Sequence, residues 1–203
     1  PLRRQRQMCI RDRPDVLLKQ VEHEPALKRA FFTPLDWQLL RHCPIPVYLL
    51  GAARPALPRQ IVAAVDVADP SPEGQARNNS IIQQANALAL QTGAQLDLLC
   101  ACDLTMAYMG DMGYGAWAIG DVGESLRHAL EDDFKALADR YGAPAERRHC
   151  LLGRPVAVLS EYVETHPVDV IVMGRPLARG LDRLFGSTTE HVLYQIPCNI
   201  LAV

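Results

Sequence analysis

The chain has 203 residues, of which 49% are hydrophobic and 22% charged, and its formal net charge is −2. This composition supports a packed core and excludes a globally disordered chain, and no apolar run approaches the roughly 18 residues of a membrane-spanning helix. The near-neutral charge gives no reason to expect nucleic acid or a membrane as a partner, and because no apolar signal sequence opens the chain we expect a cytoplasmic protein.

Residues 1–13 carry a disproportionate share of the positive charge. They hold five Arg and one Asp, a net of +4, which leaves a net of −6 for the rest of the chain. A basic arm that binds nucleic acid is one interpretation of this segment, and a disordered terminus is another. We favour a third: the run RRQRQMCIRDR, in a chain without an initiator Met, resembles translated adapter sequence. We therefore expect 1–13 to be a non-native disordered tail on a protein that was originally longer.

A proline-rich joint divides the remaining chain into unequal parts. Residues 52–59 are predicted to be a linker between segments 14–51 and 60–203, because glycine and proline interrupt regular structure there. The first segment is too short to form a domain by itself, since it provides two strands and one helix at most.

Segment 60–203 alternates apolar runs with helical patterns. Strands are predicted at 61–65, 96–101, 146–152, 168–173 and 199–203, with helices at about 80–92, 122–141 and 155–165 and another starting near residue 187. Residues 66–79 and 102–121 are predicted loops, and the second is long enough to be functional. Gly93 is placed to end the first helix, and the mixed polarity of 146–152 favours an edge strand. Strands joined by helices predict an α/β fold with a five-stranded parallel sheet sandwiched by helices.

Ligands of such sheets bind beyond the carboxyl ends of the strands. Asp66 and Gly174 directly follow two predicted buried strands. Gly186 and Ser187 precede a predicted helix, and Glu190 completes a capping box with Ser187. A helix N-terminus of this kind can bind an anion. The alternative is that Gly186 and Ser187 simply cap the helix.

Four separated motifs resemble the universal stress protein family. They are IVAAVD at the start of the segment, GRPVAVL before the third helix, DVIVMG at the fourth strand and GSTTEHVLYQIPCNILAV at the end. The resemblance implies a complete domain over 60–203, with an adenine-nucleotide alpha-hydrolase-like fold. The upstream run DWQLLRHCPIPVYLL parallels EHVLYQIPCNI, so 14–51 resembles the closing part of a preceding copy.

The resemblance also implies a nucleotide motif, G-x2-G-x9-G-[ST], that this chain matches in part. The cofactor-binding candidates that it implies are Asp66, Met173, Gly174, Gly186, Ser187 and Thr188. Leu177 replaces the second glycine, and the interval from Gly174 to Gly186 is one residue too short. Arg175 and Arg179 either compensate by neutralising phosphate or are solvated. We expect a stress-response module that binds a small ligand at a degenerate nucleotide site without catalytic residues; ATP binding, with slow hydrolysis at most, is the alternative.

The chain has six cysteines, too sparse for a disulfide scaffold. Cys100 and Cys102 lie on one face of a strand end, and Cys150, next to His149, could join them from the third predicted strand. Zinc needs about four ligands. We favour buried small hydrophobes over a metal site and predict no metal.

The resemblance further implies partners. In the full-length protein, the complete domain would form a pseudo-dimer with its own first domain, with strand 46–50 close to strand 199–203; a homodimer is the alternative.

Overall fold

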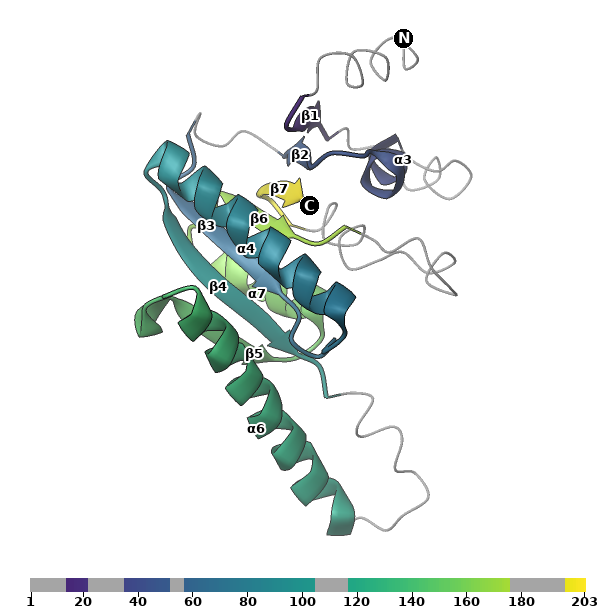
Figure 1. Ribbon diagram of the computed structural model, residues 1–203, viewed down its shortest axis with the longest axis vertical. Helices are drawn as coiled ribbons and strands as arrows, with labels where there is room; N and C mark the ends of the chain where they lie inside the picture. Colours follow the sequence, from purple (N-terminus) through teal and green to yellow (C-terminus); the bar gives the residue numbers. More distant parts are fainter. Residues whose placement is uncertain (1–13, 22–34, 52–56, 105–116, 176–195) are drawn as a thin grey trace.

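The computed structural model describes residues 14–21, 35–51, 57–104, 117–175 and 196–203. Within them, one sheet has the strand order β1-β2-β7-β6-β3-β4-β5 (Figure 1). The strands are β1 (Leu17–Gln20), β2 (Val47–Leu50), β3 (Gln60–Val65), β4 (Gln95–Cys102), β5 (Arg148–Leu152), β6 (Val170–Met173) and β7 (Asn199–Ala202). The helices are α3 (Leu35–His42), α4 (Pro72–Thr92), α6 (Trp117–Arg140) and α7 (Pro155–Thr165), with a 3-10 turn at Ala145–Arg147.

Strands β3 to β7 form the predicted five-stranded parallel sheet. β3 pairs with β4 on one side and β6 on the other, and β5 and β7 extend the sheet outward. The edge position predicted for the third strand is confirmed by β5, which ends the described sheet. The sheet continues past β7, because β2 pairs with β7 in antiparallel orientation and β1 pairs with β2 in parallel. The predicted proximity of strands 46–50 and 199–203 is therefore confirmed.

Helices cover both faces of the sheet (Figure 1). Alternate side chains of a strand point to opposite faces, so Ile171 of β6 packs in the core under α7 and α3, whereas Val170 and Val172 pack in the core under α4 and α6. All three side chains are fully buried. Parallel strands that are buried on both faces are rich in Val and Ile, which explains why the run 170–173 is continuously apolar.

Helix α4 begins at Pro72, well before the predicted start near residue 80. Ser71 caps it, since the Ser71 hydroxyl accepts a hydrogen bond from the Gly74 N–H at 3.0 Å. Proline at the first helical position needs no N–H partner. The prediction was wrong here because the first two turns are mostly polar, so the apolar periodicity starts late. The predicted end is confirmed: Gly93 adopts a left-handed conformation with φ 71°.

Other boundaries moved by a few residues. α6 begins at Trp117 rather than 122, which shortens the predicted 102–121 loop, and residues 105–116 of that loop lie outside the described residues. β5 begins at Arg148 because the 3-10 turn takes the two residues before it. The predicted tail, most of the linker and the helix from residue 187 lie outside the described residues. No helix in the described ranges is long and apolar enough to cross a membrane.

Candidate functional site

The candidate site lies at the carboxyl ends of β3 and β6, where the order in which the chain adds strands to the sheet reverses. From β3 the chain runs through α4 to β4 on one side, while β6 pairs with β3 on the other side. Ala64 is in register with Met173, so Asp66 and Gly174 leave the same edge of the sheet. The structure thus brings Asp66, Met173 and Gly174 together, at the position where parallel sheets bind ligands. The other predicted site residues, Gly186, Ser187 and Thr188, lie outside the described residues.

Asn78 holds the backbone of Asp66 in place. Its side-chain Oδ1 accepts a hydrogen bond from the Asp66 N–H at 3.0 Å, and its Nδ2 donates one to the Asp66 carbonyl at 2.7 Å. Asn78 itself is buried in the first turns of α4. The Asp66 carboxylate is exposed and accepts a hydrogen bond from the Ala68 N–H at 3.0 Å. Sequence analysis missed Asn78 because it fell in the predicted loop 66–79.

Arg77 packs across Gly174. A Cβ atom at Gly174 would lie 2.7 Å from Cδ of Arg77, so the aliphatic part of Arg77 fills the space that the glycine leaves. The Arg77 guanidinium donates a hydrogen bond to the Asp69 carboxylate at 2.8 Å. Hydrogen bonds from Ser71, and then the charge and hydrogen bond of Arg77, lower the pKa of Asp69. The gap between the two strand ends is therefore covered by an ion pair, which sequence reasoning also missed.

Arg175 is held by the upstream segment. Its side chain donates a hydrogen bond to the Cys43 carbonyl, and its N–H donates one to the Val203 carbonyl at 2.9 Å. The sequence left two interpretations of Arg175, a phosphate ligand or a solvated loop residue. Its hydrogen bond to the Cys43 carbonyl fits neither of them. Arg179 lies outside the described residues.

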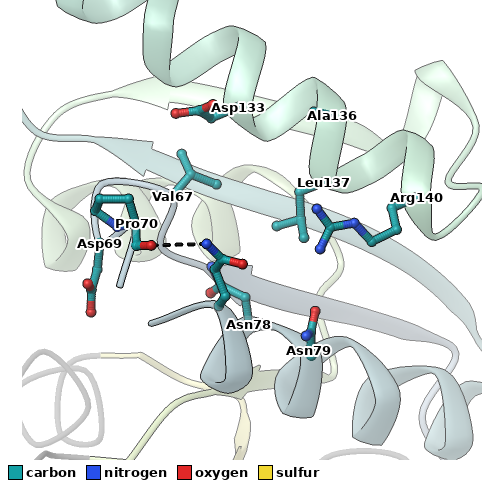
Figure 2. Close-up of a pocket in the computed structure, with 10 residues that line it drawn as sticks. Val67, Asp69, Pro70, Asn78, Asn79, Asp133, Ala136, Leu137 and Arg140 are labelled. Carbon is teal, nitrogen blue, oxygen red and sulfur yellow. Dashed lines mark hydrogen bonds between the residues drawn. The ribbon is translucent and has the colours of Figure 1, made fainter. Parts of the chain in front are cut away.

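A cavity of about 150 Å³ opens beside Asp66, between the β3–α4 loop, α4 and α6 (Figure 2). Val67 and Pro70 come from the loop, Asn78 and Asn79 from α4, and Asp133 from α6. The remaining lining residues are Asp69, Gln75, Ala136, Leu137 and Arg140. Pockets for drug-sized ligands occupy about 300–1,000 Å³, so this cavity has room for ordered water or a fragment of a ligand.

Three cysteines meet at the same end of the sheet. Cys100 of β4 is in register with Cys150 of β5, and Cys102 lies two residues further along β4. The Sγ atoms of all three lie within 4.8 Å of one another, and those of Cys102 and Cys150 are 2.9 Å apart. A hydrogen bond from Cys100 lowers the pKa of Cys102 to about 6, and the reciprocal interaction raises that of Cys100.

A second polar cluster occupies the opposite, amino end of the strands. Asp97 accepts hydrogen bonds from the side chains of Gln60 and Tyr162. Its carboxylate lies 3.8 Å from Nε2 of His149. Burial lowers the pKa of His149 and raises that of Tyr162. Because ligands of parallel sheets bind at the other end, this cluster is best explained as a structural network between β4, β5 and α7.

Comparisons with known proteins agree on one family. A sequence model of the universal stress protein family matches residues 58–203. The universal stress protein E homolog of Haemophilus influenzae is 29% identical over 196 residues, covering 93% of this chain and 62% of that protein. Universal stress protein A homolog 1 of Coxiella burnetii is 29% identical over 150 residues, covering 71% of this chain and 95% of that protein.

A solved structure has a similar fold. A functionally unknown protein from Pseudomonas aeruginosa PAO1 superposes with a TM-score of 0.76 at 26% identity, covering 97% of this chain and 65% of that one. The chain therefore spans less than two thirds of the length of the first relatives that it matches.

Proposed function

Because the chain belongs to the universal stress protein family, we propose that it is a ligand-binding regulatory protein of the stress response whose nucleotide site is degenerate. The observation that carries this proposal is the packing of Arg77 on Gly174, with its guanidinium paired to Asp69. Glycine at a strand end lets a ligand approach the backbone closely. Here that space is taken by a side chain of the protein itself.

Sequence and charge support the same conclusion. Leu177 replaces the second glycine of the family's nucleotide motif, and the interval before Gly186 is one residue short. Because Arg77 balances the charge of Asp69, the exposed carboxylate of Asp66 is the group that disfavours a polyphosphate there by like-charge repulsion. The expected ligand is small or weakly charged, and we propose that it is bound without turnover.

ATP binding remains the second candidate, and two observations favour it. Asp66 and Gly174 leave the same edge of the sheet, as the family's nucleotide site requires. Arg77 also places a cation at that end of the sheet, where it donates a hydrogen bond to Asp69. A guanidinium can bind a phosphate in place of a carboxylate. In this alternative, Arg77 would leave Asp69 and bind the nucleotide.

We also propose that the complete domain, residues 60–203, forms a pseudo-dimer with a preceding domain in a longer cytoplasmic protein. Two observations support it: β2 extends the sheet through its antiparallel pairing with β7, and Arg175 bonds to Cys43 across the same junction. Residues 14–51 would then be the closing part of that preceding domain.

A thermal-shift experiment with Mg-ATP separates the two candidates. A ligand at 100 times its Kd stabilises a folded protein by about 2.7 kcal/mol. We expect no shift for the unaltered chain at millimolar Mg-ATP. Asp66→Ala serves as the control, since it removes an exposed carboxylate of the candidate site without filling buried space. A shift that Asp66→Ala reduces would overturn the degenerate-site proposal.

The variant Arg77→Ala identifies the reason for either result. If Arg77 blocks the site, its removal should create a shift that the unaltered chain lacks. If Arg77 instead binds phosphate, the unaltered chain should shift and Arg77→Ala should not.

A further inference from the structure

The three converging thiols have no role in the proposed nucleotide site. Cys100 and Cys102 are buried on the α4–α6 face of β4, and Cys150 on β5 is half-buried. The backbone N–H of Val67, which also lines the cavity beside Asp66, donates a hydrogen bond to Cys100. The cluster therefore lies next to the cavity but uses a separate set of side chains.

The geometry points to a metal site: we propose that Cys100, Cys102 and Cys150 bind one zinc ion through their three sulfur atoms, with the fourth position taken by water or another donor. Soft thiolate ligands select zinc or monovalent copper over the hard cations. A zinc–sulfur bond is about 2.3 Å long, so any two sulfur ligands lie within about 4.6 Å of each other. The three Sγ atoms lie within 4.8 Å of one another, which exceeds that limit by at most about 0.2 Å.

The adjustment that zinc requires is small. In a tetrahedral site, sulfur atoms bound at 2.3 Å lie about 3.8 Å apart. The Sγ atoms of Cys102 and Cys150, which are 2.9 Å apart, must therefore separate by about 0.9 Å. Cysteine has one side-chain torsion, and rotation about it moves the sulfur by that amount without moving the strands. The backbone register of β4 and β5 can stay as it is.

Access and charge are also compatible with a metal. β5 is an edge strand of the described sheet, and the half-buried Cys150 gives the ion a route from solvent. Binding releases the protons of those thiols that are still protonated, and the resulting centre, zinc with three thiolates, has a net charge of −1. Arg127 and Glu131 of α6 both act electrostatically on Cys102 and are paired at 3.2 Å, so the charges of these two side chains largely offset each other at the site.

The experiment uses the full chain, reduced with a non-thiol reductant and freed of metal with a chelator. Zinc is then titrated, and the thiols that stay reactive toward an aromatic disulfide reagent are counted. We expect one zinc per chain and one fewer reactive thiol in the zinc-loaded protein, that of the half-buried Cys150, because Cys100 and Cys102 are buried with or without zinc. Cobalt(II), used as a coloured substitute, should give sulfur-to-metal charge-transfer absorption.

Two variants make the test specific. Losing a residue that merely orients a metal ligand costs about 10–100-fold in affinity, so Cys150→Ser, which removes a ligand, should weaken zinc binding by at least about 100-fold. Cys43→Ser is the matched control, because Cys43 is also half-buried but lies at the end of α3, and it should bind zinc like the unaltered chain.

Several results would overturn the proposal. These are zinc binding that Cys150→Ser does not weaken, zinc binding that leaves the number of reactive thiols unchanged, and one-to-one binding of copper(I) with no binding of zinc. A Cys102–Cys150 disulfide that persists under reduction and excludes the metal would also overturn it. Thiol counting needs no variant, so the test holds even if Cys150→Ser fails to fold.

Discussion

Replacing Asn78 tests whether a buried side chain positions the candidate site. Asn78 donates to and accepts from the backbone of Asp66 in two hydrogen bonds of 2.7 and 3.0 Å. Asn78→Ala removes both and leaves two backbone groups of Asp66 without these partners. Each intramolecular hydrogen bond contributes about 1 kcal/mol net, and unpaired buried groups cost more. The expected loss in the free energy of unfolding is therefore about 2–3 kcal/mol.

That loss is large enough to measure by thermal unfolding. For a chain of this size, 1 kcal/mol lowers Tm by about 2–4 °C, so Asn78→Ala should lower it by roughly 4–12 °C. Asn79→Ala is the matched control on the next residue. Asn79 accepts one hydrogen bond, from the Tyr141 hydroxyl at 2.7 Å, and is half-buried. Its removal should cost about 1 kcal/mol.

A second variant separates the hydrogen bonds from the volume of the side chain. Asn78→Asp keeps the shape but places a carboxylate oxygen against the Asp66 carbonyl, where the amide had donated. It should destabilise the chain at least as much as Asn78→Ala. The two Asn78 hydrogen bonds do not hold Asp66 in place if Asn78→Ala loses no more unfolding free energy than Asn79→Ala, or if Asn78→Asp is as stable as the unaltered chain.

Three further predictions concern stability. Asp169→Ala removes a buried carboxylate that accepts two backbone hydrogen bonds at the start of β3. Urea unfolding should therefore show a loss of about 2–4 kcal/mol in the free energy of unfolding, and no loss would mean that these hydrogen bonds do not stabilise the chain. Gly174→Ala should destabilise an Arg77→Ala chain less than it destabilises the unaltered chain, because the Arg77 side chain that the new Cβ meets is gone. An equal loss of stability in both backgrounds of a double-mutant cycle would disprove the contact between Arg77 and Gly174. Burial lowers the pKa of His149, and the charge of Asp97 offsets only part of that shift, so the unfolded state binds the His149 proton more tightly than the folded state does. Stability should fall as the pH drops below about 6.5, and His149→Gln should flatten this fall; an unchanged profile would contradict it.

The fold could be predicted because its signals are local and repeated. Continuous apolar runs such as 61–65 indicate strands buried on both faces, and their alternation with helices indicates parallel pairing. Gly93 ends α4 as expected, since it has the left-handed conformation that glycine adopts at little cost. The pairing of β2 with β7 followed from the family resemblance rather than from any pattern within strand 47–50 itself.

The site was predicted less completely because its contacts are not local. Asp66 and Gly174 could be placed by their position after buried strands, but Arg77 and Asn78 lie in a polar stretch that looked like a loop. Nothing in that stretch shows that one side chain covers Gly174 and the next holds Asp66, since both contacts depend on the packing of α4 against the sheet. The sequence also left the cysteine cluster undecided, because only the register of β4 against β5 decides whether Cys150 lies opposite Cys100.

Equilibrium dialysis against Mg-ATP tests the central claim, a degenerate nucleotide site in a universal stress domain, most directly. With the full chain at a concentration comparable to millimolar nucleotide, we expect equal ATP on both sides of the membrane and no ADP formed. Saturable retention of one ATP per chain, weakened in Asp66→Ala, would overturn the degenerate site and establish the ATP-binding alternative.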